Sequence, residues 1–160
     1  MENFVIIGGH KIYHETTQST FWKNVKTKIW EPETLKILDR FVKPGKIFID
    51  IGAWNGVLSL YASKLGARVE SVECDPKAID FFIANYQLND GNIFLSTCAI
   101  SDKTGVSTLE SHNGDWGNSM STIVDRHEQM GQIAVETQTL EKFARSRKIN
   151  GNYIPINPKK

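Results

Sequence analysis

The stretch Lys46-Ile47-Phe48-Ile49-Asp50-Ile51-Gly52-Ala53-Trp54-Asn55-Gly56 decides the fold of this chain. It is typical of a buried strand, a carboxylate, a glycine-rich turn and the start of a helix. Such a layout builds a nucleotide-cofactor pocket at the carboxyl end of a parallel strand. The glycine spacing is D-x-G-x-x-x-G, whereas dinucleotide-binding proteins carry G-x-G-x-x-G. This spacing argues against a nicotinamide-dependent protein.

The acidic residue of this turn suggests which cofactor it holds. Asp50 directly precedes the glycine turn, where a carboxylate suits a cofactor with a cationic group, although nearby backbone N–H groups could equally satisfy it. S-adenosylmethionine carries an ammonium and a sulfonium, and it is the cofactor that we expect. Gly52 and Gly56 would let the backbone approach the ligand. Ala53 and Trp54 form the turn, and Trp54 either walls the cofactor or belongs to the core.

Three further residues follow the next two predicted strands. Glu73 ends the second strand, and the carboxyl ends of neighbouring parallel strands lie side by side. We expect an exposed glutamate there to accept the ribose hydroxyls of a nucleoside. Asp75 either reaches the adenosine or caps the next helix. Ser101 follows the third strand, where it would flank the adenine.

Hydrophobic periodicity predicts an α/β fold. The alternation of strands and helices with short connections argues for a parallel sheet with right-handed crossovers. A hairpin and a helical or loop segment precede it, and short antiparallel strands and a last helix follow it. The expected ranges are a hairpin at 3–14, a helical or loop segment at 18–28, a helix from 31, strands at about 46–51, 67–73 and 92–98, helices at 56–65 and 75–88, antiparallel strands at 106–110, 119–124 and 132–138, and a helix at 140–147.

Composition sets broad bounds on function. The 160 residues, with 40% hydrophobic and 23% charged side chains, suit one soluble domain. A net charge of +1 predicts no nucleic-acid or membrane partner, and no apolar run is long enough for a transmembrane helix. Cys74 and Cys98 form no disulfide framework, so we expect a cytoplasmic protein with reduced thiols. The four histidines show no metal-ligand spacing, and we expect no metal.

Several motifs in succession resemble the FkbM family of S-adenosylmethionine-dependent methyltransferases. The resemblance covers about residues 30–144 in the family's order. Besides the opening stretch, it includes Trp30-Glu31-Pro32-Glu33-Thr34, Val42-Lys43-Pro44-Gly45, Glu73-Cys74-Asp75-Pro76, Asn85 with Asn89, Ala99-Ile100-Ser101-Asp102, Trp116-Gly117-Asn118-Ser119-Met120-Ser121 and Val135-Glu136-Thr137-Gln138-Thr139-Leu140-Glu141-Lys142-Phe143.

The resemblance implies a Rossmann-like class I methyltransferase sheet in a single domain over 1–160, with residues 1–30 as an N-terminal hairpin and helix extension. It implies that Asp50, Gly52, Gly56 and Glu73 bind S-adenosylmethionine and that Glu31 lies near it. It also implies O-methyl transfer to a hydroxyl of a sugar or natural product, hence a small-molecule or glycan acceptor.

The end of the chain departs from the family pattern. Where the family continues into a strand like I-K-I-D-x-E-G, this sequence has Pro155 and Asn157. We therefore expect an N-terminal half that lacks the fourth strand, so that the first strand is an uncovered edge. A second copy in a homo-oligomer, a partner chain or the tail Tyr153–Ile156 could cover it. The alternative function is then a catalytically inactive cofactor-binding remnant or assembly module.

The sequence identifies no general base. His112, Asp115 and His127 lie in the segment after the third strand and could face a substrate. A solvated loop explains them at least as well.

Overall fold

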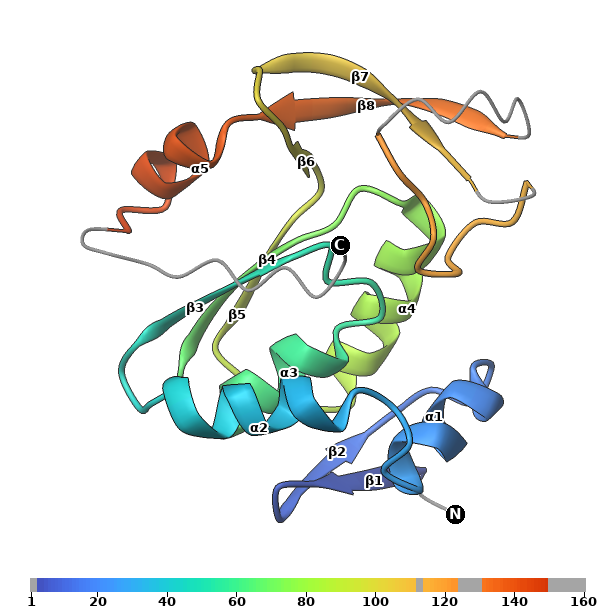
Figure 1. The fold of residues 1–160 in the computed structure, drawn as a ribbon, viewed down its shortest axis with the longest axis vertical. Helices are drawn as coiled ribbons and strands as arrows, with labels where there is room; N and C mark the ends of the chain where they lie inside the picture. The colour runs from blue at the N-terminus through green and yellow to red at the C-terminus, as the bar shows by residue number, and fades with distance from the viewer. Residues whose placement is uncertain (1–2, 112–113, 124–130, 150–160) are drawn as a thin grey trace.

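The computed structural model describes residues 3–111, 114–123 and 131–149 (Figure 1). Its elements are β1 (Phe4–Ile7), β2 (His10–Tyr13), α1 (Ser19–Lys26), α2 (Pro32–Phe41), β3 (Ile47–Ile51), α3 (Val57–Lys64), β4 (Arg68–Val72), α4 (Pro76–Gln87), β5 (Ile93–Ser96), β6 (Ala99–Ile100), β7 (Gly105–Glu110), β8 (Gln132–Gln138) and α5 (Leu140–Ser146). The predicted α/β class is confirmed, and the parallel strands and their helices lie within a few residues of their expected positions. No helix of the described part is both long and apolar enough to span a bilayer.

A parallel sheet of three strands lies at the centre, in the order β3-β4-β5. Ile47 is opposite Arg68 and Ile51 is opposite Val72, so β3 and β4 end at the same level. In the described residues β3 has β4 as its one neighbour, as the edge-strand expectation requires. The tail Tyr153–Ile156 lies outside the described residues.

One face of this sheet packs against α3. The N-terminal hairpin joins the apolar core on the same side. Ile12 of β2, Trp22 of α1 and Leu38 of α2 are buried in the same apolar cluster as Tyr61 of α3. Figure 1 shows α2 and α3 on this side of the sheet, with β1, β2 and α1 beside them. This packing fixes the N-terminal elements against the helix that follows the glycine turn.

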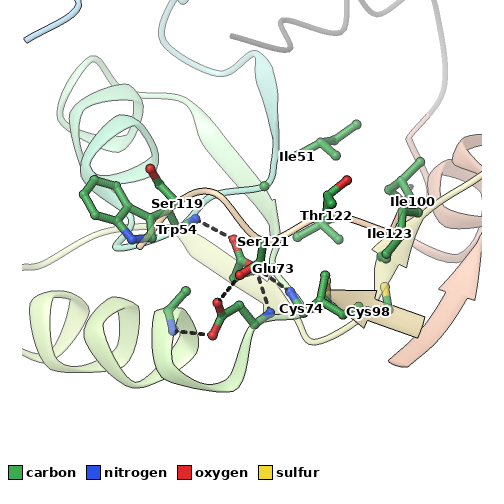
Figure 2. A pocket seen from close by; sticks show the side chains of 16 residues that line it. Ile51, Trp54, Glu73, Cys74, Cys98, Ile100, Ser119, Ser121, Thr122 and Ile123 are labelled. Atoms are coloured by element: carbon green, nitrogen blue, oxygen red, sulfur yellow. Dashed lines mark hydrogen bonds between the residues drawn. The ribbon is translucent and has the colours of Figure 1, made fainter. Parts of the chain in front are cut away.

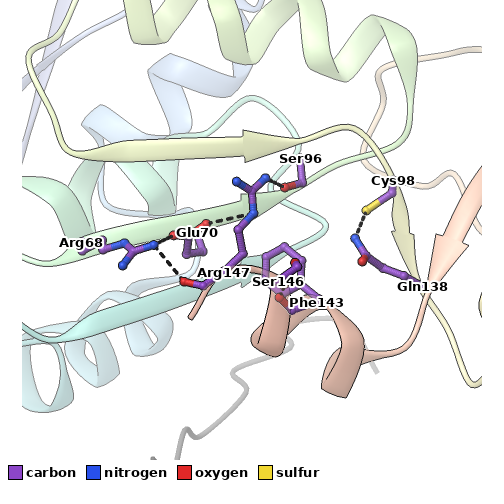
Figure 3. Close-up of polar contacts among 8 residues, drawn as sticks. All are labelled: Arg68, Glu70, Ser96, Cys98, Gln138, Phe143, Ser146 and Arg147. Atoms are coloured by element: carbon purple, nitrogen blue, oxygen red, sulfur yellow. Dashed lines mark hydrogen bonds and ion pairs between the residues drawn. The ribbon is translucent and has the colours of Figure 1, made fainter. Parts of the chain in front are cut away.

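The opposite face of the sheet carries α5. Phe143 of α5 is fully buried in a cluster with Ile49 of β3 and Val72 of β4. Figure 3 shows the polar part of this contact, in which the buried Glu70 lies between the guanidinium groups of Arg68 and Arg147. The parallel sheet is therefore covered on both faces, as parallel sheets require.

The segment after β5 differs from the three predicted antiparallel strands. Its sheet has the order β6-β8-β7, and the short β6 pairs in parallel with β8. The predicted strand at 119–124 is wrong over its described part, where Thr122 forms a single bridge to Glu110. Gly117 and Ser119 adopt left-handed backbone conformations, which prevent an extended strand there.

Candidate functional site

A cavity of about 220 Å³ opens where β3 and β4 end (Figure 2). It brings together four residues that the sequence singled out, namely Gly52, Trp54, Glu73 and Asp75. The complete lining is Ile51, Gly52, Trp54, Val72, Glu73, Cys74, Asp75, Ala78, Cys98, Ala99, Ile100, Leu109, Ser119, Ser121, Thr122 and Ile123. The location matches the rule that open parallel sheets bind ligands at the carboxyl ends of their strands.

The turn after β3 leaves free space above its first glycine. Gly52 has φ of 75°, and its N–H donates to the Val72 carbonyl at 2.8 Å. A Cβ built on Gly52 would meet no atom within 4 Å. Ala53 donates to the same carbonyl at 3.0 Å and lies outside the cavity lining. The turn is thus held by β4, and a ligand can approach its backbone at Gly52.

The Glu73 carboxylate holds two turns together. Its Oε1 accepts the N–H groups of Cys74 and Asp75 at 2.8 and 2.9 Å, and its Oε2 accepts the Trp54 N–H at 2.8 Å. Glu73 is only 9% exposed, so the expectation of an exposed glutamate is wrong. The reason is local, because both turns direct unpaired backbone donors toward the end of β4.

Asp75 caps α4, which is one of the two roles expected for it. Its Oδ1 accepts from the N–H groups of Lys77 and Ala78 at 2.9 and 3.2 Å. Its Oδ2 accepts from the Gly117 N–H at 2.8 Å and from the Ser121 hydroxyl at 2.7 Å. The side chain is buried, and all of these partners belong to the protein.

Besides Ala53, the candidate residues Asp50, Gly56, Ser101 and Glu31 lie outside the cavity lining. Asp50 is 3% exposed and accepts the Ser59 hydroxyl at 2.5 Å on the α3 side of the sheet. A Cβ on Gly56 would lie 2.8 Å from the Phe82 ring, so this glycine allows helix packing. The Ser101 hydroxyl donates to Asp102 at 3.1 Å. For Asp50 and Gly56, these contacts join different elements of the fold, and the sequence pattern alone did not predict them.

Glu31 has an unsatisfied carboxylate oxygen. The residue begins α2 with φ of 40°, and its Oε2 is buried without a hydrogen-bond partner in the described part of the protein. The ring of the neighbouring Trp30 packs edge-on against the Phe21 ring, with 5.2 Å between the ring centroids. The Phe21 ring packs in the same way against Trp54, with 4.5 Å between the centroids. This aromatic row connects the start of α2 with the glycine turn.

Burial and the nearby negative charges favour the protonated form of the Cys74 thiol. Burial, and after it the negative charges of Glu73 and Asp75, raise the pKa of Cys74 to about 12. A neutral thiol is a poor nucleophile. Cys74 therefore serves as part of the cavity wall.

The segment 117–123 is the part of the site that the functional reasoning did not assign. It contributes Ser119, Ser121, Thr122 and Ile123 to the lining (Figure 2). The available signal was the Trp116–Ser121 motif in the family resemblance. Of the other insertion candidates, Asp115 is exposed and outside the lining, while His112 and His127 lie outside the described residues.

Comparison with known proteins finds similarity in the central part of the chain. A family model described as ribosomal protein L11 methyltransferase (PrmA) matches residues 32–107, which include β3, α3, β4, α4 and β5. Ribosomal protein L11 methyltransferases of Bacillus cereus (strain Q1) and Geobacillus kaustophilus are 43% and 41% identical over 56 residues, and that of Campylobacter hominis is 36% identical over 55. Each match covers 34% of this chain and 18% of the relative.

These matches support an S-adenosylmethionine-dependent methyltransferase, and they imply S-adenosylmethionine as the methyl donor. They support this class without singling out the FkbM family. The expected small-molecule or glycan acceptor is wrong on this comparison, because the matched relatives are named for a protein, ribosomal protein L11. The residues around the glycine turn could not reveal this, since what they indicate about a ligand concerns the cofactor and not the acceptor.

Proposed function

We propose that this chain binds S-adenosylmethionine in the cavity at the ends of β3 and β4 and directs its methyl group to a protein acceptor. The observation that carries the proposal is the free space above Gly52, where a Cβ would meet nothing within 4 Å. That space opens onto a cavity that also contains the Glu73 carboxylate. The Rossmann-like class I arrangement, and the FkbM resemblance over residues 30–144, belong to the same proposal.

Glu73 is the residue we assign to the ribose. A carboxylate offers about four lone-pair positions, and the backbone occupies two on Oε1 and one on Oε2. One position on Oε2 is left for a ribose hydroxyl. The backbone donors also fix the carboxylate in place, so that little side-chain entropy is lost when the nucleoside binds.

Glu31 is the residue we assign to the cationic methionine end. Its buried Oε2 lacks a donor in the described residues, and a buried carboxylate oxygen without a partner is costly. An ammonium group would satisfy it, and the neighbouring ring of Trp30 suits a cation as well. Asp50 acts indirectly in this proposal, by holding the end of β3 through Ser59.

When bound, S-adenosylmethionine supplies an electrophilic methyl group on its sulfonium. The task of this chain is then to orient the donor and to exclude water from it. The acceptor class rests on the names of the relatives, which specify a ribosomal protein. The shared stretch is a small part of those relatives, so the acceptor requires a direct test.

A second candidate function is a cofactor-binding module without turnover. It is favoured by the state of the acidic groups that line the cavity in the described residues. Asp75 and most of Glu73 are occupied by backbone and hydroxyl donors, and the Cys74 thiol stays protonated. These groups are therefore committed mainly to holding the fold, whereas proton transfer from an acceptor needs a positioned base.

The test is calorimetric titration of the chain with S-adenosylhomocysteine, with NAD as the control. Saturable binding of S-adenosylhomocysteine alone supports the proposed cofactor site, and absence of binding by folded protein refutes it. Radiolabelled S-adenosylmethionine incubated with purified ribosomal protein L11, and separately with an unrelated basic protein, then separates the two functions. Label on L11 supports a methyltransferase, whereas cofactor binding without label on either protein favours the module.

A further inference from the structure

A roof segment, residues 117–123, covers the candidate cofactor cavity and lies outside the residues 32–107 that the family comparison matches. Its far end is fixed to the second sheet, where Thr122 and Glu110 exchange two backbone hydrogen bonds of 2.8 and 2.9 Å. Between its ends, Ser119 adopts a left-handed backbone conformation with φ of 63°. The roof segment is thus a tight arch and continues no strand.

The near end of the roof segment is held by two residues of the site itself. The Gly117 N–H donates to Asp75 Oδ2 at 2.8 Å, and its carbonyl accepts the Trp54 indole N–H at 2.6 Å. The Ser121 hydroxyl adds a third bond, to Asp75 Oδ2, at 2.7 Å. Gly117 also packs closely on α4, because a Cβ there would lie 2.7 Å from Lys77 and 2.8 Å from Phe81.

The two oxygens of Asp75 have separate tasks. Oδ1 caps α4, and in the described residues Oδ2 accepts hydrogen bonds from the Gly117 N–H and the Ser121 hydroxyl, both in the roof segment. Hydrogen bonds to a charged, buried acceptor are stronger than neutral ones. One carboxylate therefore connects the start of α4, next to the ribose-binding Glu73, to the cover of the cavity.

The cavity is small for the ligand proposed. Ligand pockets are typically about 300–1,000 Å³, and with the roof segment in place this one measures about 220 Å³. A nucleoside therefore needs more room than the cavity offers with the roof segment in this position, and movement of the roof segment would supply it. The bonds at Asp75 and Trp54 are those that such a movement breaks, because the far end is bonded to β7 through the bridge between Thr122 and Glu110.

We propose that the roof segment closes over the bound nucleoside and that Asp75 is the positioning residue that holds it closed. The inference rests on the proposed function, since it assumes that the cavity binds S-adenosylmethionine. Asp75 then acts on cofactor residence time through its bonds to the roof segment. Ser119 and Ser121 place hydroxyls at the cavity, where they can meet polar groups of the ligand.

The test is the nearly isosteric variant Asp75→Asn. Its amide oxygen can still cap α4, since asparagine is as good a cap as aspartate, but its NH₂ group cannot accept from Gly117 or Ser121. Asp80→Asn, on the exposed side of the same helix, is the matched control. We expect Asp75→Asn to release S-adenosylhomocysteine about tenfold faster in stopped flow, corresponding to roughly 1.4 kcal/mol.

Hydrogen exchange of the ligand-free proteins gives a second readout. Amides of the roof segment should exchange about tenfold faster in Asp75→Asn, with no change in Asp80→Asn. Unchanged release and unchanged exchange would overturn the proposal. If Asp75→Asn does not fold, Ser121→Ala replaces it. This variant removes one hydrogen bond between the roof segment and Asp75, leaves the α4 cap intact and should accelerate release several-fold. A wild-type rate of release in Ser121→Ala would equally overturn the proposal. If the wild-type chain binds no S-adenosylhomocysteine, the proposed function fails, while exchange in the free proteins still decides whether Asp75 holds the roof segment.

Discussion

The Glu73 carboxylate accepts the backbone N–H of Trp54 at 2.8 Å, and this bond joins the end of β4 to the glycine turn after β3. The two residues are 19 positions apart in the chain. The same carboxylate accepts two N–H groups of its own turn. One side chain therefore shapes the cavity and, in our proposal, binds ligand within it.

Replacement of Glu73 should affect stability and binding to different degrees. Glu73→Ala leaves three backbone donors without their partner and should lower the free energy of unfolding by about 2–4 kcal/mol. Glu73→Gln keeps one acceptor oxygen and should cost about half as much, yet weaken S-adenosylhomocysteine binding about tenfold. Urea denaturation and calorimetry measure the two effects. Wild-type affinity in a folded Glu73→Gln would refute the ribose role. Wild-type stability in Glu73→Ala would refute a stabilising role for the three backbone hydrogen bonds to Glu73.

Alanine substitutions at the two glycines of the turn should affect cofactor affinity and protein stability to different degrees. Gly52→Ala adds a methyl group to open space at the cavity and should cost about 1 kcal/mol of backbone strain, while weakening binding. Gly56→Ala places its Cβ 2.8 Å from Phe82 and should cost about 3 kcal/mol or more. Adding Phe82→Leu to Gly56→Ala should restore part of that loss. Equal stability of the two single variants would contradict this assignment.

Much of the fold follows from local sequence signals. Asp75 and Pro76 begin α4 as an aspartate cap and a proline at the first helical position should, and the apolar runs locate the parallel strands. The short β6 is missed because two residues carry no periodic signal, and its pairing with β8 depends on residues nearly 40 positions away.

The candidate site was harder to predict, since its decisive contacts are long-range. The bond between Asp75 and Gly117 spans 42 positions, and no local pattern indicates it. Glu73 was expected at the right place but with the wrong exposure, because backbone donors cannot be read from side-chain identity. Whether a Cβ would fit at Gly52 or Gly56 likewise depends on neighbours from other elements.

Glu70 provides a test of how α5 is held on the sheet. Its side chain is fully buried, with Arg68 beside it and Arg147 Nε at 3.5 Å (Figure 3). Both arginines are partly exposed and can turn to solvent when Glu70 is removed. Loss of the Glu70 carboxylate should therefore lower the free energy of unfolding by less than loss of both guanidinium groups. Arg68→Met with Arg147→Met should lower stability by about 3–5 kcal/mol by leaving a buried charge unpaired.

Glu70→Met should cost less than this double variant, and the triple variant should be more stable than the double one. Thermal denaturation at neutral pH measures all four proteins. A triple variant no more stable than the double one would show that the ion pairs are not coupled.

Stability should fall in alkaline solution because two acidic groups resist ionisation in the fold. Burial raises the pKa of Cys74 from its ordinary 9.0 to about 12, and the charges of Glu73 and Asp75 add to this. Burial, and after it the hydrogen bond to Asp39 and the charge of Asp39, raise the pKa of Tyr61 above its ordinary 10.0. Both groups lose their protons more readily in the unfolded chain than in the folded protein.

Between pH 9 and 12 the folded protein therefore binds more protons than the unfolded chain, and the free energy of unfolding decreases as the pH rises. Well below pH 9 both states keep the Cys74 proton, so this group gives no slope there. Urea denaturation at a series of pH values should show a shallower alkaline decline in Cys74→Ser than in the wild type, since serine does not titrate in this range. An identical decline in Cys74→Ser would mean that the thiol ionises equally well in both states, which its burial beside Glu73 and Asp75 argues against.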